Sequence, residues 1–483
     1  MSLTDPVIYW FRRDLRLTDL PGLHAALASG KPVIPCFILD DESTEEWAMG
    51  GASRWWLHHS LQALTKSVAE QGGNLLVRRG DTQAQLNALV NETGAAAVYC
   101  SELYEPDARE LEKTLGEELA KSGAALHCLP GTLFFRPHEV RNGSGLPFKV
   151  FTPFWRHCMQ RLPSMPLPQK TTFTTNSFLQ HSLTGLSCEQ WQLLPDSPNW
   201  AADWHSYWTP GEAGATETLK QFVTNTLADY AQGRDFPARD ASSRLSAHFH
   251  WGEISPRQAW AAVNKAPGSN EKDQHKFLSE LGWRDFNHHL LFHFPHIADR
   301  PFKPSFSQMP WQGSDETFKA WCEGRTGYPI VDAGMRELWQ TGFMHNRVRM
   351  ICASFLTKHL LLPWQWGARW FWDTLVDADL ANNSGGWQWV AGCGADASPW
   401  FRIFNPMLQG KKFDGDGEYV RRWLPELAGL SDRDLQIPWE APPLVLADAG
   451  VTLGSDYPFP IVDHKEARVA ALDAYDAVSK ASS

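Results

Sequence analysis

The segment DADLANNSGGWQW, from Asp377 to Trp389, concentrates side chains that could hold a polar ring system. It sets two aspartates, Asp377 and Asp379, and two asparagines, Asn382 and Asn383, beside a glycine pair and two tryptophans. Carboxylates and amides bond the polar edge of a flat ligand, and indoles pack on its face. So many polar side chains are unusual in a hydrophobic core, so this combination indicates a redox-active or light-absorbing ligand.

Two neighbouring strings extend this block. Upstream, TGFMHNRVRMICASFL contributes Asn346, Arg349 and Met350, and downstream SPWFRIFNP closes it. Still earlier in the chain, ELGWRDF supplies Glu280 and Trp283, a carboxylate beside an indole.

The string ASSRLSAHFHWGEISPR places the hydroxyls of Ser242, Ser243 and Ser246 at the start of a predicted helix. Free backbone N–H groups and the helix dipole make such an end a binding site for phosphate. Serines also cap helices in every kind of protein, so this string alone is a weak signal.

Short apolar runs alternate with amphipathic stretches between residues 7 and 128. The runs are VIYWF, VIPCFIL, LLVRR, AAVYC and ALHCL, and the amphipathic stretches lie at 20–28, 53–69, 82–91 and 107–121. Strand and helix in strict turn predict an α/β domain with a parallel, doubly wound sheet. No GxGxxG string follows the first run, which disfavours an ordinary dinucleotide site there.

The pattern changes twice after this α/β region. At about 131–210 the chain is rich in Pro, Ser and Thr with weak periodicity, typical of a long, mostly irregular connector. After it, apolar residues recur at helical spacing with Gly and Pro punctuation. We therefore expect an α/β domain at 1–130, a connector at 131–210 and an all-helical domain at 211–483.

Size and charge limit the classes of function. A chain of 483 residues with 43% hydrophobic residues is long enough for two cores. Its net charge of −11 has the wrong sign for a chain that binds nucleic acid over its whole surface. Any DNA-binding surface must therefore be a local basic patch.

The start of the chain and its cysteines indicate an intracellular protein. The short apolar run VIYWF before Arg12 and Arg13 predicts a strand and not a signal peptide. No apolar stretch approaches the roughly 20 residues of a membrane span. Eight cysteines are scattered singly without a CxxC pair, which fits reduced thiols and argues against zinc.

In their order and over nearly the whole chain, these strings resemble the photolyase/cryptochrome family, most closely its bacterial cyclobutane pyrimidine dimer photolyases. The resemblance implies an N-terminal Rossmann-like antenna domain and a C-terminal helical domain that binds FAD. It also implies that the protein is a lyase, an enzyme that splits the carbon–carbon bonds of a pyrimidine dimer. Excited reduced FAD passes an electron to a pyrimidine dimer flipped out of UV-damaged DNA, the ring splits, and the electron returns.

The same resemblance assigns the FAD contacts. In the family a serine-rich string after a tyrosine grips the FAD diphosphate, and Arg349 and Asp377 match an ion pair beside the flavin ring. Asp379 matches the neighbouring acid that accepts a hydrogen from the cofactor. A purely structural salt bridge is the plain alternative for the pair. The matching residues are Tyr230, Ser242, Ser243, Arg244, Leu245, Ser246, Phe277, Arg284, Asn346, Arg349, Asp377, Ala378, Asp379 and Asn383.

Asn383 matches the position that faces flavin N5 in the family. A neutral amide can bond N5 yet cannot hand over a proton as a carboxylic acid would, so an anionic reduced flavin should persist. This favours electron donation over signalling. The plain alternative is an asparagine that satisfies turn backbone, as Asn382 and Ser384 could also do.

The chain contains 24 tryptophans, whose default role is helix packing. The resemblance places Trp387, Trp364 and Trp311 on a chain of three tryptophans that carries electrons from the surface to the flavin. Their spacing in three dimensions cannot be taken from the sequence.

A second matching group lines the substrate cavity of the family: Glu280, Trp283, Asn346, Met350 and Trp389. Stacking on an aromatic face returns about 1–3 kcal/mol per base, enough to offset the flipping of a dimer. Glu280, buried beside indoles and protonated, could donate to the dimer radical anion. The plain alternative is an aromatic core stripe with a surface glutamate.

The MHNRVRM string also separates lesion types. Photolyases for the (6-4) photoproduct place two histidines near here, whereas this chain has Asn346 and Met350 at the substrate-facing positions. His345 remains, but a lone histidine beside a site is more often structural. The cyclobutane lesion is favoured, and (6-4) repair stays an alternative. On the DNA side we expect Lys411 first, because LQGKKFDG resembles the DNA-facing loop of the family.

The string WRDFNHHLLFHFP resembles the class III branch, which is related to plant cryptochromes. WRDFNHHLLFHFP carries Asn287 where an aromatic is common, and in SELYEPDAREL the pair Asp107 and Ala108 replaces the folate-contacting Asn–Glu pair of familiar bacterial enzymes. Through the branch we expect 5,10-methenyltetrahydrofolate as the antenna chromophore. A deazaflavin, a second flavin or no antenna stay open.

A cryptochrome-like blue-light photoreceptor is the alternative from a different class of function. Asn383 counts against it, and so does the lack of a long disordered tail. We expect a monomer without an obligate protein partner, in the bacterial cytoplasm and at the nucleoid through its DNA.

Overall fold

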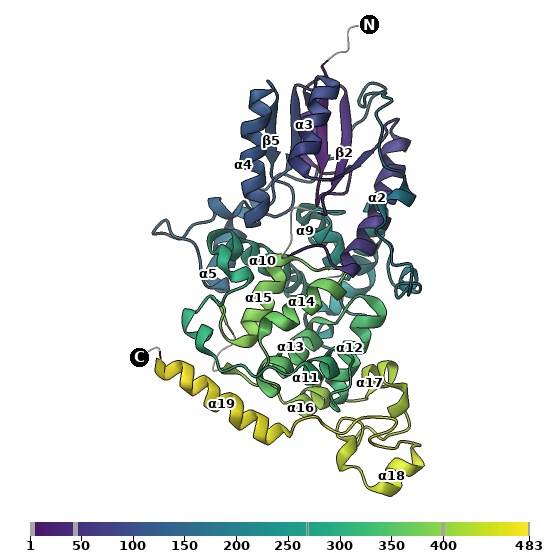
Figure 1. Cartoon of the computed structure of the whole chain (residues 1–483), viewed down its shortest axis with the longest axis vertical. Helices are drawn as coiled ribbons and strands as arrows, with labels where there is room; N and C mark the ends of the chain where they lie inside the picture. The colour runs from purple at the N-terminus through teal and green to yellow at the C-terminus, as the bar shows by residue number, and fades with distance from the viewer. Residues whose placement is uncertain (1–4, 42–46, 267, 269, 398–400, 482–483) are drawn as a thin grey trace. The chain divides into compact units, whose positions relative to one another are not determined.

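The computed structural model describes residues 5–41, 47–266, 268, 270–397 and 401–481 (Figure 1). The chain forms two compact units. The first consists of residues 1–200, 208–228 and 243–295, and the second of residues 201–207, 229–242 and 296–483. Both units are discontinuous in sequence, and the contiguous limits expected at 130 and 210 stay a prediction.

A five-stranded parallel sheet forms the centre of the first unit. Its strands are β1 (Val7–Phe11), β2 (Val33–Leu39), β3 (Leu76–Arg79), β4 (Ala97–Ser101) and β5 (Ala125–Leu129). Their order is β3-β2-β1-β4-β5, so the chain builds one side of the sheet outward from β1 and then the other. This is the doubly wound topology, and the α/β prediction is confirmed.

Helices follow each of the first four strands: α1 (Pro21–Ala28), α2 (Gly51–Glu70), α3 (Thr82–Thr93) and α4 (Pro106–Lys121). The Asp81 carboxylate caps α3 by accepting the N–H of Ala84 at 2.7 Å. Alternate strand residues such as Ile8, Ile34 and Val98 form a buried core with apolar residues of α3 and α4. This period-2 pattern buries one face of the sheet under the two helices.

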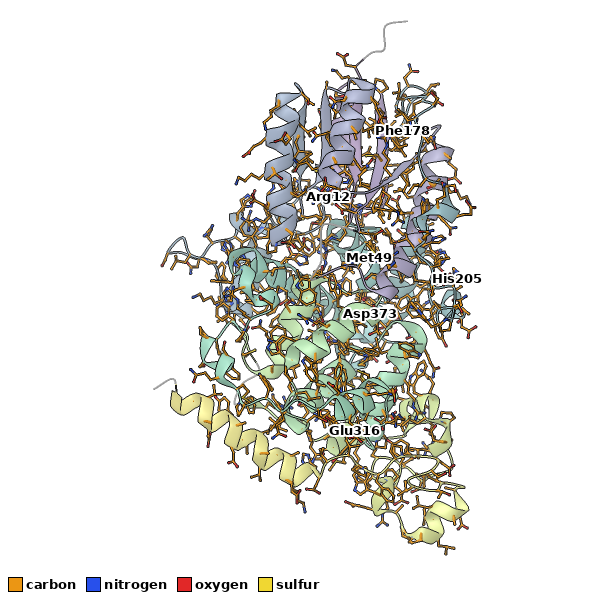
Figure 2. All side chains as sticks on the ribbon, viewed as in Figure 1. Arg12, Met49, Phe178, His205, Glu316 and Asp373 are labelled. Atoms are coloured by element: carbon orange, nitrogen blue, oxygen red, sulfur yellow. The ribbon has the colours of Figure 1, made fainter. Side chains whose placement is uncertain are left out.

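Two side chains of the first unit lie at the ends of inner strands of the sheet (Figure 2). Phe178 lies beside β2, where it forms a parallel bridge with Val33. Arg12 directly follows β1, and its guanidinium donates to the Ser101 carbonyl of β4 at 3.2 Å. Arg12 therefore occupies the point between β1 and β4 where the strand order reverses.

The rest of the first unit is helical or irregular. Its helices are α5 (Phe151–Arg161), α6 (Glu212–Gln221), α8 (Ser246–His250), α9 (Pro256–Asn264) and α10 (Glu271–His293). α5 lies in the region expected to be mostly irregular. Pro153 falls in its first turn, where a proline costs no hydrogen bond.

Helices also build the second unit around one large core. They are α7 (Tyr230–Gly233), α11 (Asp315–Cys322), α12 (Pro329–Thr341), α13 (Asn346–Ser354), α14 (Trp364–Thr374), α15 (Leu380–Ala391), α16 (Pro406–Phe413), α17 (Glu418–Trp423), α18 (Pro443–Asp448) and α19 (His464–Ala481). The core includes Val331, Leu356 and Leu427, all fully buried. The helical spacing of the sequence after residue 211 is confirmed.

Among the described residues, no helix combines the length and the apolar character that crossing a membrane requires. All eight cysteines are free thiols, as their scattered positions indicated.

Candidate active site

Helices α13 and α15 carry several of the polar residues that the sequence marks. α13 begins after His345, whose side chain accepts the N–H of Arg347 at 3.2 Å. α15 begins after Asp379, whose carboxylate accepts the N–H of Asn382 at 2.8 Å. Each cap satisfies a backbone donor that the first turn of a helix leaves free. The caps thus fix where both helices begin.

Arg349 of α13 and Asp377, just before α15, form an ion pair. Nη2 of Arg349 lies 2.9 and 3.1 Å from the two carboxylate oxygens, and its Nε donates to the Met344 carbonyl at 2.7 Å. Only 5% of the Asp377 side chain and 25% of the Arg349 side chain are exposed. A carboxylate buried this far is costly without its partner, so the two residues act as one unit.

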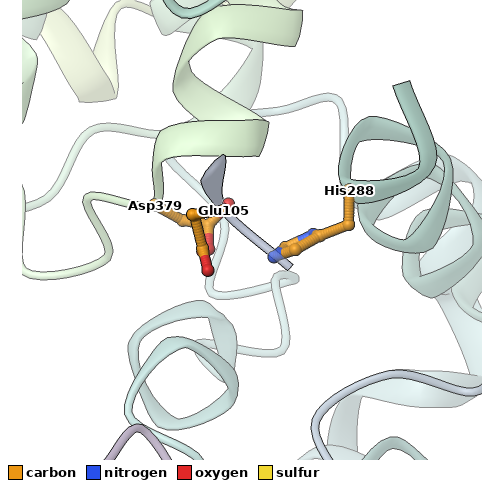
Figure 3. Close-up of side chains that lie close together, drawn as sticks. All are labelled: Glu105, His288 and Asp379. Atoms are coloured by element: carbon orange, nitrogen blue, oxygen red, sulfur yellow. The ribbon is translucent and has the colours of Figure 1, made fainter. Parts of the chain in front are cut away.

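Asn383 is held from α14. Its Nδ2 donates to the Ala368 carbonyl at 2.8 Å. Because the nitrogen end of the amide is engaged, its oxygen is the end that can accept a bond from a ligand. Asp379, at the start of α15 (Figure 3), is buried and accepts a further bond from Nδ2 of Asn382 at 2.9 Å. The next residue back, Ala378, is buried as well.

Trp387 lies in the core of the second unit, where a glycine makes room for it. A Cβ at Gly367 would lie 2.0 Å from Cη2 of the indole. The Trp387 ring meets those of Phe371 and Trp321 edge-on, with centroids 5.0 and 6.2 Å away. Trp321, which no sequence motif singled out, is fully buried and donates its indole N–H to the Cys352 carbonyl.

The other two tryptophans of the expected relay belong to the same core. Trp364 is buried at the start of α14, and Trp311 is half-buried before α11. The ring contacts shown for Trp387 run to Phe371 and Trp321. A continuous path from Trp387 through Trp364 to Trp311 stays a prediction.

Asn346 and Met350 lie one turn apart on α13. Nδ2 of Asn346 is 4.0 Å from Sδ of Met350, as expected for residues four apart on a helix. Asn346 is exposed and Met350 is half-buried, so both can meet a ligand from outside. Trp389 is half-buried on α15. The structure therefore offers all three side chains at the surface of the second unit.

His345 has a structural role, as the sequence indicated. It is buried, and burial lowers its pKa to about 4, so the ring is neutral near pH 7. The neighbouring Arg347 is tied to Asp235 by an ion pair of 2.7 Å. These contacts leave the start of α13 without a free histidine for acid–base work.

A helix begins in the serine string, as expected, but the serine side chains do not cap it. α8 begins at Ser246, yet its N-cap is Leu245, with no side-chain hydrogen bond to the helix. The Ser243 hydroxyl accepts the Leu245 N–H at 3.4 Å, and Arg244 has a left-handed φ of 53°. Ser246 is exposed and Ser242 half-buried. These hydroxyls are therefore not consumed as helix caps.

The remaining expected FAD residues are held in their own units by packing and hydrogen bonds. Tyr230 is buried at the start of α7. Phe277 of α10 is buried against Phe222, with ring centroids 4.7 Å apart. Arg284 donates to the Thr132 carbonyl at 2.6 Å and to the Phe249 carbonyl at 3.2 Å. Arg284 thus ties α10 to α8.

Glu280 differs from expectation. Its carboxylate forms an ion pair of 2.9 Å with Lys276, one turn earlier on α10, and 28% of its side chain is exposed. The expectation that it is buried beside indoles is wrong, because the carboxylate pairs with a cation one helical turn away and stays partly exposed. Trp283, on the next turn, is half-buried and stacks on Phe151.

Lys411 and Lys412 are exposed in the last turn of α16. Nearby basic residues are engaged: Arg421 pairs with Asp432 at 2.7 Å, and Arg422 donates to a backbone carbonyl. Lys411, with Lys412 beside it, therefore remains a candidate for contact with a phosphate backbone.

Sequence reasoning missed a buried polar pair in the first unit. Glu105 and His288 direct a carboxylate oxygen and a ring nitrogen toward each other within 4.8 Å (Figure 3). Arg13 balances Glu105 through an ion pair of 2.5 Å. His288 belongs to the histidine-rich HHLLFHFP string, which was a visible signal in the sequence, but only the fold brings Glu105 to it.

Comparison with known proteins gives a consistent result. Residues 7–172 match the family model of DNA photolyase, and residues 277–477 match that of the FAD binding domain of DNA photolyase. A deoxyribodipyrimidine photo-lyase of Agrobacterium fabrum is 49% identical over 99% of this chain and 100% of its own length. Cryptochrome-1 of Arabidopsis thaliana is 38% identical over 97% of this chain and 70% of its own length.

Among solved structures, a bacterial class III photolyase from Agrobacterium tumefaciens superposes with a TM-score of 0.95. It is 48% identical and covers 99% of this chain and 98% of its own. Similarity of this extent spans both units and every segment of the candidate site. The chain therefore belongs to the photolyase/cryptochrome family, with the fold of a bacterial class III photolyase.

Proposed function

We propose that the chain is a deoxyribodipyrimidine photo-lyase, which uses light and reduced FAD to split cyclobutane pyrimidine dimers in DNA. The observation that carries the proposal is Asn383, a neutral amide held by Ala368. It lies within a chain that shares 49% identity over full length with a relative of that name.

The donors and acceptors near α15 fit a flavin. Arg349 offers a fixed positive charge, Asp377 keeps the guanidinium in place, and the Asn383 oxygen can accept a bond from flavin N5. Ser242, Ser243 and Ser246 offer hydroxyls for the diphosphate, since none of them caps α8. Reduced FAD, when bound, supplies an electron on absorbing blue light.

The chain's own contribution at the flavin is electrostatic. The cationic Arg349 favours a negatively charged ring, and an amide at position 383 has no acid proton to give it. A ring that stays anionic keeps its electron available for a substrate. We assign electron supply to Trp387, Trp364 and Trp311 from the core of the second unit.

Substrate binding falls to Glu280, Trp283, Asn346, Met350 and Trp389. Trp283 and Trp389 stack on the flipped pyrimidines, each stack being worth about 1–3 kcal/mol. Asn346 and Glu280 bond the pyrimidine edges. To do so, Glu280 must leave its ion pair with Lys276 and bond the pyrimidine instead. Breaking that pair costs little free energy because it is partly exposed.

Residues 1–130 form the antenna domain with 5,10-methenyltetrahydrofolate as its chromophore, 131–210 the connector, and 211–483 the domain for FAD and repair. Lys411 contacts the DNA backbone. The protein acts as a monomer in the cytoplasm, beside the DNA that it repairs.

The test is blue-light repair by purified, reduced, FAD-loaded protein of two oligonucleotides. One carries a cyclobutane thymine dimer and the other a (6-4) product, each with a dark control. Restoration of the first alone, and only in light, is expected. Restoration of the second would show that Asn346 and Met350 do not select the lesion.

A variant separates repair from mere binding. Glu280→Ala should slow repair per absorbed photon more than it weakens DNA binding. If neither lesion is restored although FAD is bound and photoreducible, a photoreceptor function takes the place of this proposal.

A further inference from the structure

One ring face of Trp283 is already occupied. The Phe151 ring of α5 stacks on it with centroids 3.9 Å apart and planes 10° apart. Phe286 of α10 meets the same indole edge-on at 5.7 Å and 77°. A parallel ring on one face and a perpendicular ring at its side fix the plane of the indole.

α5 is packed closely on α10 so that this stack can form. A Cβ at Gly282 would lie 2.4 Å from Cε3 of Trp155, so the absence of a side chain there lets α5 approach. Phe154 is buried and its ring lies 5.2 Å from those of both Phe286 and His289. Phe151 is thus presented by a rigid element rather than by a loop.

His289 fixes the segment that leads into α5. Its Nε2 accepts the Phe148 N–H at 3.0 Å, and its Nδ1 lies 3.2 Å from the Pro137 carbonyl, which can only accept. The ring is therefore neutral, with its proton on Nδ1. Burial lowers its pKa to about 3, so this arrangement persists at neutral pH. His293 bonds the same Pro137 carbonyl at 3.1 Å.

We infer that Phe151 is a positioning residue, which holds the Trp283 indole so that only its opposite face accepts a pyrimidine of the lesion. The inference rests on the proposed function, because it takes Trp283 as a platform for a flipped base. A preset platform binds more tightly, since the side chain loses less freedom when the base arrives. Phe151 touches no base in this scheme and acts through Trp283 alone.

Phe151→Leu tests the inference, because leucine fills similar space without a ring. With FAD-loaded protein and duplexes with and without one cyclobutane thymine dimer, affinity for the damaged duplex should fall roughly three- to tenfold. Affinity for the undamaged duplex should stay unchanged. Repair per absorbed photon at saturating substrate should also stay unchanged, because the positioned base is the same once bound.

Two further variants give the test its specificity. Phe151→Tyr keeps the ring and should restore affinity for the damaged duplex. In a Trp283→Ala background, Phe151→Leu should have no further effect, because the two residues act as one unit. FAD content and photoreduction of each variant verify that the fold is intact.

Four outcomes would overturn the inference. Tighter binding by Phe151→Leu would mean that Phe151 occupies the place of the base and must leave it. An equal loss for both duplexes, or an additive loss in the Trp283→Ala background, would mean that Phe151 only supports the packing of α5. If the unaltered protein binds FAD but shows no preference for damaged DNA, the proposed function itself fails and the inference with it.

Discussion

The candidate residues lie in two regions, one in each unit, that are held in different ways. In the first region, the Trp283 indole of α10 is fixed by rings: Phe151 lies on its face and Phe286 at its edge. Around Asn383, α15 is fixed by charge and hydrogen bonds, from Asp379 at its start and from Ala368 in α14. Stacked rings set a plane and tolerate substitution by similar shapes. Buried polar groups fix the positions of the donor and acceptor atoms they bond, so they tolerate almost no substitution.

The difference suits the two tasks that we propose. A lesion must enter and leave, so an apolar platform with one open face is sufficient. A flavin stays bound, and its charge depends on each neighbour, so every polar group near it must be satisfied. Changes in the polar region should therefore have larger effects than changes in the aromatic region.

Loss of the Arg349 charge should have the largest effect. Arg349→Leu leaves the buried Asp377 carboxylate unpaired, which costs about 3 kcal/mol of unfolding free energy and should abolish FAD binding. Urea unfolding and the flavin absorbance of the purified protein measure both. Arg325→Ala is the matched control: it removes one partner of an exposed pair and should cost under about 1 kcal/mol. Equal effects of the two variants would contradict the comparison.

Asn383→Asp should follow in size. Aspartate offers no donor to the Ala368 carbonyl, and the buried acceptor left behind costs about 1–3 kcal/mol. It also adds an acid beside the flavin, so photoreduction should become dependent on pH. At Asn142 the side-chain oxygen accepts two backbone N–H groups, which aspartate does equally well, so Asn142→Asp should be neutral. A fully stable, pH-independent Asn383→Asp would place the flavin elsewhere.

Acid should weaken the aromatic region through His289. Burial, and then the neighbouring His293, hold the pKa of His289 at about 3 in the folded state, below that of an unfolded histidine. The unfolded chain therefore binds a proton first as pH falls from about 6.5 toward 3, and stability drops by up to ~1.4 kcal/mol per pH unit.

His289→Gln removes this titration. Between pH 6 and pH 5 the parent should lose about 1 kcal/mol more unfolding free energy than the variant, because only the parent carries the titrating His289. Urea titration of both proteins at the two pH values measures this. Parallel pH profiles for the two proteins would mean that His289 is not the group that titrates.

The smallest effect is expected at an exposed residue that neither stacked rings nor buried polar contacts hold. Lys411 is exposed on α16, so Lys411→Ala should weaken binding to damaged and undamaged DNA alike. The slope of log affinity against log salt should fall by about 1. Lys319→Ala, which removes an equally exposed cation of α11, serves as the control and should leave the slope unchanged. A loss confined to damaged DNA would give Lys411 a different role.

Local pattern was sufficient for the sheet and for most helices. Each predicted run between residues 7 and 129 forms a strand within one residue of its expected limits, because short apolar runs that alternate with amphipathic helical stretches favour the strands of a parallel sheet. The helix α5 was not recognised, because Pro153 and the prolines after it obscured a short amphipathic pattern. A proline in the first turn breaks no hydrogen bond, which only the position of the helix start reveals.

Some features of the candidate residues could likewise be predicted from local sequence, and others could not. Residues near each other in sequence, such as Asn346 with Met350 and Asp379 with Asn382, lie together because a helix brings them there. The burial of Glu280 was wrongly expected, although Lys276 four residues earlier was a visible signal. Trp321 gave no signal at all, since one buried tryptophan among 24 has no distinct local pattern.

The sequence by itself determined the alternating α/β region, the helical remainder and the set of residue types that could serve a flavin and a pyrimidine dimer. It did so because period, composition and motif are local properties. Only the tertiary structure decided that Phe151 covers Trp283, that Ala368 takes the amide nitrogen of Asn383, and that His289 carries its proton on Nδ1. Each of these depends on a contact between segments distant in the chain, and packing of the whole fold sets such contacts.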